Sequence, residues 1–185
     1  IYEERSSKEK ISFLPEKGFV VQAYTAGVRV KWKMFMNVVS SEKIDVPQMM
    51  MDDQCAPQMM MSLFLEKGKM RVEKDKSGSE AAIWDVCVHP DVMKLIREQK
   101  EYEDSVVKAA LNAVENDFNR STEGDAKLEL SGSYQIVRGC SYKGELRTMC
   151  INTKDGAAAE FNEPVRNQEG GSKKKGGSAL QQTDE

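Results

Sequence analysis

Residues 28–39 read VRVKWKMFMNVV, and every second residue of this stretch is apolar. Such alternation predicts a half-buried β-strand, because successive side chains of a strand point to opposite faces of the sheet. The other face begins with three cations, Arg29, Lys31 and Lys33. By pattern alone, they are best interpreted as solvated charges that discourage edge-to-edge aggregation, and the alternative is a surface that binds an anionic group. The predicted core positions are Val28, Val30, Trp32, Met34, Met36 and Val38.

The length, composition and net charge of the chain limit the class of protein. The chain has 185 residues, of which 39% are hydrophobic and 31% charged, and its formal net charge is -3. This length suits one ordinary domain with tails. A general nucleic-acid-binding protein is normally basic, so nucleic acid is not an expected partner, although a local basic patch is allowed. No apolar run approaches the roughly 18 to 20 residues of a membrane helix, so a membrane is not expected either.

The cysteines suit a reducing compartment. Their spacing matches no CxxC or Cys/His zinc pattern, so we expect no metal site, and the sequence suggests no cofactor. We expect a cytoplasmic protein without a signal peptide. The chain begins with Ile1 instead of Met, so we expect a fragment or a processed product. The four cysteines are Cys55, Cys87, Cys140 and Cys150.

Two hairpins are expected in the first half of the chain. The first joins a strand at 19–24 to the opening stretch through a turn, and within that stretch Phe35 and Val39 are expected to pack. The second joins a strand at 68–74, in which Arg71 lies opposite Met70 and Val72, to an apolar strand at 81–88 that is covered on both faces. The turns are predicted at 25–27 and 75–78.

Residues 40–61 are expected to form a long connection with an internal repeat. Pro47–Met51 and Pro57–Met61 both read PQMMM. Methionine is flexible and fills irregular gaps, so the favoured interpretation is a loop laid over the core. The alternative is an adaptable binding surface.

Helical periodicity replaces the strand pattern after residue 89. Pro90 and Asp91 suit the start of a short helix that ends near Glu98. A longer helix is predicted from about Glu101 to Asn119, with an apolar stripe at spacings of three and four. Two short strands are expected at 127–131 and 134–138. The stripe consists of Val106, Val107, Ala110, Leu111, Val114 and Phe118.

No catalytic constellation is recognisable. The sole histidine, His89, stands beside a proline without a nucleophile motif, so a structural role is expected. The Asp52–Asp53 pair lies in the methionine segment, where nothing would raise one pKa over the other. Nucleophile-elbow, metalloprotease, dinucleotide and kinase motifs are missing. We therefore expect a protein that is not an enzyme.

An ordered series of segments resembles the PIH domain family, named for interaction with a heat-shock chaperone. The resemblance covers about residues 18–146. It implies an α/β (α+β) fold with a single PIH-type domain, in which helices pack on a curved, mainly antiparallel sheet. We expect an N-terminal arm at 1–17, the PIH-like domain at 18–150 and a polar, low-complexity tail at 151–185. The segments are GFVV (18–21), KMFMNV (33–38), MSL (61–63), VEKDKSG (72–78), WDVCVHPDV (84–92), YQIVR (134–138) and YKG (142–144).

The resemblance implies a non-catalytic adaptor for protein–protein interaction. Such domains act with chaperones and the Rvb ATPases, or in the cytoplasmic preassembly of axonemal dynein arms, and some bind an acidic phosphoserine motif. Carried over by position, the implied peptide- and phosphate-binding residues are Lys33, Lys31, Arg29, Arg138 and Lys143.

Two positions depart from the family pattern. Gln22 stands where relatives have a lysine, and Cys140 stands where they often have a basic residue. A phosphate at Gln22 would lack a charge-assisted hydrogen bond worth about 1.5 to 3 kcal/mol. Whether Gln22 shares a face with Lys33 depends on the register of the hairpin. An alternative function is a structural subunit of an assembled ciliary or axonemal complex.

Overall fold

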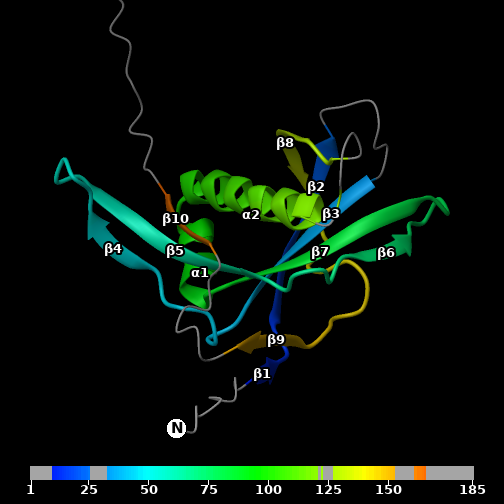
Figure 1. Cartoon of the computed structure of the whole chain (residues 1–185), viewed down its shortest axis with the longest axis horizontal. Helices are drawn as coiled ribbons and strands as arrows, with labels where there is room; N and C mark the ends of the chain where they lie inside the picture. Colours follow the sequence, from blue (N-terminus) through cyan, green and yellow to red (C-terminus); the bar gives the residue numbers. More distant parts are fainter. Residues whose placement is uncertain (1–9, 26–32, 121, 123–126, 153–160, 166–185) are drawn as a thin grey trace, which may run out of the picture.

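The computed structural model describes residues 10–25, 33–120, 122, 127–152 and 161–165, the last five by their backbone. It has a curved sheet with two helices on one side and a small two-stranded sheet on the other (Figure 1). The helices are α1 (Pro90–Glu98) and α2 (Lys100–Arg120). The strands are β1 (Lys10–Phe13), β2 (Glu16–Thr25), β3 (Lys33–Ser40), β4 (Gln48–Met51), β5 (Pro57–Leu65), β6 (Arg71–Lys74), β7 (Glu80–Val88), β8 (Leu130–Ile136), β9 (Met149–Asn152) and β10 (Phe161–Val165).

The main sheet has the strand order β10-β5-β7-β3-β2-β8, with β4 paired to β5 and β6 paired to β7. β3 lies inside this sheet, parallel to β7 and antiparallel to β2. Every other strand pairing in the described part of the chain is antiparallel. The predicted class, an α+β domain with a curved, mainly antiparallel sheet and packed helices, is confirmed.

The two faces of the sheet have separate cores. On the inner face, which we define as the face covered by α1 and α2, Met34, Met36 and Val38 of β3 pack against the predicted stripe of α2. On the outer face, opposite the helices, Phe35 and Val39 belong to two further apolar clusters. The β1–β9 sheet contributes to one of these clusters, so it covers part of the outer face.

The opening stretch is therefore more deeply buried than its alternation predicts. Met34, Met36 and Val38 are core residues, as predicted, and the packing of Phe35 and Val39 is confirmed. The expectation of a half-buried strand is wrong, because Asn37 is also fully buried. An interior strand has neighbours on both edges, and here helices and the β1–β9 sheet cover its two faces. Residues 28–32, with Arg29 and Lys31, lie outside the described part of the chain.

Gly18 lets β2 approach β3 closely. A Cβ atom at this position would lie 2.3 Å from the carbonyl oxygen of Val38 and 2.4 Å from Cε of Met93. The β2–β3 register shifts between Lys17 and Phe19, so Gly18 marks a bulge in the hairpin. Only glycine fits there without displacing the backbone of β3.

The prediction of a long connection at 40–61 is wrong. The two PQMMM repeats contain β4 and the first half of β5, which pair as an antiparallel hairpin. Periodicity did not show this hairpin, because the methionine runs 49–51 and 59–61 do not alternate with polar residues. In Figure 1 the hairpin projects from the body on the left, away from the helices.

Other boundaries also differ from the expected ones. Residues 10–17, placed in an arm, form β1 and the start of β2, and β1 pairs with β9 at the other end of the domain. The expected strands at 127–131 and 134–138 are one strand, β8, which contains Gly132 at a φ of 71°. Within the expected tail, residues 161–165 form β10.

Both predicted helices are confirmed. His89 is the N-cap of α1, where its Nδ1 accepts a hydrogen bond of 3.1 Å from the backbone N–H of Asp91. Pro90 occupies the first turn, as expected. His89 thus has the structural role predicted for it. None of the helices in the described residues is long and apolar enough to cross a membrane.

Candidate peptide-binding face

The strand register places several of the predicted site residues on the outer face. Gln22 of β2 lies directly opposite Phe35 of β3, and Ile83 of β7 lies beside Phe35 on the other edge. Paired residues of neighbouring strands share a face, so Gln22 belongs to the outer face. Lys33 precedes Phe35 by two residues and lies on the same face. The question left open by the sequence is therefore answered: Gln22 and Lys33 share a face.

Lys33 is already paired within the chain. Its Nζ donates a hydrogen bond to Oδ2 of Asp75, which belongs to the turn between β6 and β7. The Lys33 side chain is 46% exposed, whereas that of Asp75 is 9% exposed. The other oxygen of Asp75 accepts from the backbone N–H of Ser77 at 2.8 Å and of Ser79 at 2.9 Å. The turn therefore holds Asp75 rigidly against the lysine.

These contacts keep Asp75 ionised. The hydrogen bond from Lys33, followed by that from Ser77, holds the pKa of the Asp75 carboxyl far below its ordinary value. Because this pKa is lowered on folding, the pair contributes its full stabilisation at every pH above the ordinary carboxyl pKa. The stabilisation is lost only as the pH falls through the folded-state pKa. The charge of Lys33 is consequently offset throughout the neutral range.

Lys143 reaches the same face from the segment after β8. Its Nζ lies 4.2 Å from the centroid of the Phe35 ring, within the range of a cation–π contact. The buried side chain of Asn37 clamps the backbone of Lys143: Oδ1 accepts from Lys143 N at 2.8 Å, and Nδ2 donates to Lys143 O at 3.1 Å. Lys143 thus covers the ring of Phe35, and Lys33 lies two positions before Phe35 on the same face.

A buried polar network supports this clamp. Arg71 Nη2 donates to Asp85 Oδ1 at 2.8 Å and to the Tyr142 hydroxyl at 3.0 Å, and Arg71 Nη1 donates to the carbonyl of Glu145 at 3.1 Å. Tyr142 donates to the other oxygen of Asp85 at 2.8 Å, and Asn37 Nδ2 donates to Oδ1 at 2.8 Å. Burial, then this bond to Asp85, raises the pKa of Tyr142 to about 12.

Gly144 completes the segment that carries Lys143. Its φ of 85° lies in the left-handed region, which favours glycine. A Cβ atom there would also lie 2.8 Å from the carboxylate oxygens of Glu73. The glycine of the YKG motif therefore allows the chain to turn tightly against β6.

The remaining predicted positions contribute in different ways. Arg138 is exposed in the turn after β8. Cys140 is partly buried against the cluster around Phe35, and its Sγ lies 3.4 Å from the carbonyl oxygen of Tyr142. The structure thus places Lys33 and Lys143 on one face, with Lys143 over Phe35, and leaves Arg138 exposed near the end of β8. Arg29 and Lys31 lie outside the described residues.

Sequence reasoning missed the network that positions Lys143. Arg71 was assigned to the charged side of β6, yet Arg71 is buried and Val72 is 52% exposed. One signal was available: Asp85 interrupts the apolar run AAIWDVCV. A carboxylate in a strand that is covered on both faces needs a buried cation or donor nearby.

The comparisons with known proteins identify the family of this chain. Residues 1–158 match the family described as the PIH1 N-terminal domain. The chain belongs to this family. Protein kintoun of Drosophila sechellia is 27% identical over 154 residues, and that of Drosophila melanogaster 25%. Each match covers 81% of this chain but 17% of the relative, so this PIH1 domain corresponds to a small part of those proteins.

A solved structure supports the fold. The N-terminal domain of yeast PIH1p superimposes with a TM-score of 0.56 at 18% sequence identity. The match covers 77% of this chain and 93% of the yeast domain. At this identity the likeness shows a shared fold.

Removing one partner of the Arg71–Asp85 pair, whose side chains are 5% and 15% exposed, is expected to destabilise the domain. Arg71→Met leaves Asp85 without its cation. Asp85→Asn leaves Arg71 with only the partly exposed carboxylate of Glu73, 3.7 Å from its Nη1. Each variant should lose about 1.5 to 3 kcal/mol of unfolding free energy. The double variant should lose clearly less than the sum of the two. Urea denaturation measures all three values. Additive losses would show that the two side chains act separately.

Proposed function

We propose that this PIH1 domain is a non-catalytic protein-interaction adaptor that binds acidic or phosphorylated peptides on its outer face. The observation that carries the proposal is that Lys143, held over the ring of Phe35, and Lys33, two positions before Phe35 on β3, share the outer face. Two ammonium groups attract carboxylates and phosphates. The clamp on Lys143 lowers the entropy cost of holding one of these cations in place.

The family resemblance supports a place for this adaptor in the cytoplasm. We infer that it takes part in chaperone-assisted assembly of large complexes, of which axonemal dynein arms are the example implied by the resemblance. Its partners would be acidic client or adaptor peptides, together with a chaperone or Rvb complex. No step of this role requires a cofactor.

A second candidate is a structural subunit of an assembled ciliary or axonemal complex. Two observations favour it: Gln22 supplies no charge at a position where relatives have lysine, and Asp75 already occupies Lys33. Both features weaken the capture of a phosphopeptide, whereas neither affects a scaffold. The two candidates differ in whether the protein remains in the assembled organelle.

Charge reversal at Lys33 is expected to weaken peptide binding. An acidic phosphoserine peptide should bind the full chain with an affinity that falls as salt rises, and Lys33→Glu should reduce the affinity more than tenfold, since it replaces an attractive charge by a repulsive one. Isothermal calorimetry measures both effects. Lys94→Glu, an exposed substitution on α1 at the inner face, is the matched control and should bind as the native chain does. Absence of any peptide binding would contradict the proposal.

Removal of the Asp75 charge is expected to strengthen the same binding. Asp75→Asn keeps an oxygen that can accept from Ser77 and Ser79, so the turn is retained, but Lys33 no longer faces a carboxylate. The affinity for the acidic peptide should rise about threefold, the scale of an exposed ion pair. An unchanged or lower affinity would show that Asp75 does not compete with the peptide.

Fractionation of native cells separates the two candidate functions. An adaptor should co-purify with soluble chaperone complexes, whereas a structural subunit should remain with isolated axonemes after detergent extraction. Immunoblotting of both fractions, with a known axonemal protein as the control, measures the ratio. Recovery almost entirely in the axonemal fraction would contradict the adaptor proposal.

A further inference from the structure

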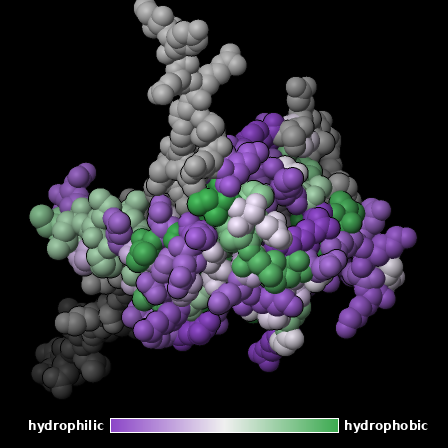
Figure 2. All heavy atoms as spheres, turned by 90° about the horizontal axis from the view of Figure 1, so that it is seen from below, coloured by the Kyte–Doolittle hydropathy of each residue, from purple (hydrophilic) through white to green (hydrophobic). Residues whose placement is uncertain are grey.

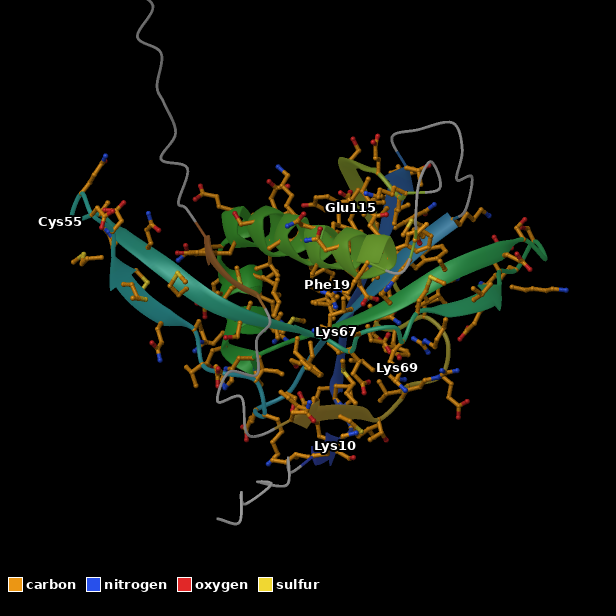
Figure 3. All side chains as sticks on the ribbon, in the orientation of Figure 1. Lys10, Phe19, Cys55, Lys67, Lys69 and Glu115 are labelled. Carbon is orange, nitrogen blue, oxygen red and sulfur yellow. The ribbon has the colours of Figure 1, made fainter. Side chains whose placement is uncertain are left out.

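The β4–β5 hairpin is a preformed arm that ends in a structured turn. Asp52 Oδ1 accepts hydrogen bonds from the backbone N–H of Gln54 at 2.9 Å and of Ala56 at 2.8 Å. The backbone N–H of Asp52 donates to Ala56 O at 2.9 Å, which closes the hairpin. Figure 3 labels Cys55 at the tip, at the left edge of the molecule. The arm therefore has a defined shape without any partner.

The register sorts the methionines of this arm onto two faces. Met49 lies opposite Met59, and Met51 lies opposite Pro57, so these residues share the inner face of β5. That face continues into Met61, which is 2% exposed in the core beneath the helices. The other face of the hairpin has a different composition, with Gln48, Met50, Gln58 and Met60.

The inner face of the arm is an apolar surface that the described residues leave open. Met61 is buried and Met59 packs partly against the core, but Met49 is 59% and Met51 is 71% exposed. Figure 2, seen from below and so from the side opposite the helices, shows pale green side chains at the end of the molecule where Figure 1 places this hairpin. Contiguous exposed apolar residues of this kind mark interaction sites, and methionine adapts to the shape of its partner.

Charge indicates which partner suits the arm. The segment 42–53, which leads into and closes the hairpin, contains four acidic residues and one lysine. Complementarity therefore favours a cationic partner. The chain's own residues 166–185 contain Leu180 as their one large apolar side chain, so their sequence provides no apolar face to cover the arm. The acidic residues are Glu42, Asp45, Asp52 and Asp53, and the lysine is Lys43.

We propose that the methionine arm, formed by Gln48–Met51 and Pro57–Met60, docks a basic amphipathic helix of a partner protein. The apolar side of that helix packs on Met49, Met51 and Met59, in line with α1 and α2 on the inner face, and its basic residues face the acidic segment. Helix-in-groove recognition of this type uses the same physics as the packing of the domain's own helices. The arm is a second surface, separate from the Lys33 face and independent of its proposed function.

Methionine-methyl NMR of the full chain tests this inference. The probe is a synthetic 16-residue helix of leucine and lysine with one apolar side. We expect it to shift the methyl signals of Met49, Met51 and Met59 most. Met49→Gln/Met51→Gln should weaken binding at least tenfold, because the helix would no longer bury two methionine side chains on binding. Met50→Gln, an equally exposed methionine on the opposite face, is the matched control and should stay within about twofold.

Two further controls make the test specific. A peptide with glutamate in place of each lysine should bind at least tenfold more weakly, and Lys33→Glu should leave binding of the basic helix unchanged. The substituted residues are exposed, so circular dichroism is expected to show intact folding for every variant. Failure of the Lys33 peptide experiment would leave this result unaffected.

Three results would overturn the inference. The first is equal loss of binding in Met50→Gln and in Met49→Gln/Met51→Gln. The second is equal affinity for the lysine and glutamate peptides. The third is a change of the Met49 and Met51 signals with protein concentration alone, which would assign the arm to contacts between copies of this chain.

Discussion

The pairing of the buried Asn37 with Asp85, whose side chain is 15% exposed, on parallel strands in the sheet interior is the constraint on which the outer face depends. A carboxylate removed from water costs several kcal/mol unless a cation and hydrogen-bond donors surround it. Arg71 and Tyr142 supply these groups, and Asn37 holds the backbone of Lys143. The need to surround Asp85 with a cation and hydrogen-bond donors therefore helps to determine the position of Lys143.

The two lysines of the outer face are held in position by different contacts. Lys143 is held by contacts below the surface, so its ammonium group stays over Phe35 without a ligand. Lys33 is held by the carboxylate of Asp75, whose side chain is 9% exposed. Under the proposed function, an anionic ligand would therefore meet Lys143 without a carboxylate partner among the described residues, whereas it would compete with Asp75 for Lys33.

The outer face and the methionine arm of this PIH1 domain differ in charge and polarity. The outer face combines cations with one aromatic ring, while the methionine arm presents flexible apolar side chains beside acidic residues. An adaptor benefits from such a difference, because a partner suited to one surface is repelled or left unsatisfied by the other. The two surfaces lie on different strands of the sheet: the outer face is built around β3 and β7, and the methionine arm is the projecting end of β5 with β4.

The amino-acid sequence by itself determined the elements with strong periodicity. The stripe of α2, the apolar run of β7 and the alternation of Met34, Met36 and Val38 each contain enough repeats to indicate a helix or strand and its buried side. The ordered motifs also led to Lys33 and Lys143. Weak patterns failed: the PQMMM repeats contain no β-branched residue, and Asp52 and Asp53 between them were interpreted as part of a loop instead of a hairpin turn.

Only the tertiary structure decided which charges are paired and which strand lies inside. The strand register placed Gln22 on the same face as Lys33. The fold brought Asp75 to Lys33 across 42 positions of sequence. It also buried Arg71, whereas the alternation predicted that Val72 would be the buried residue. These outcomes depend on contacts between residues far apart in the chain. A local pattern reports how side chains alternate along one strand, and it contains no information on what covers each face.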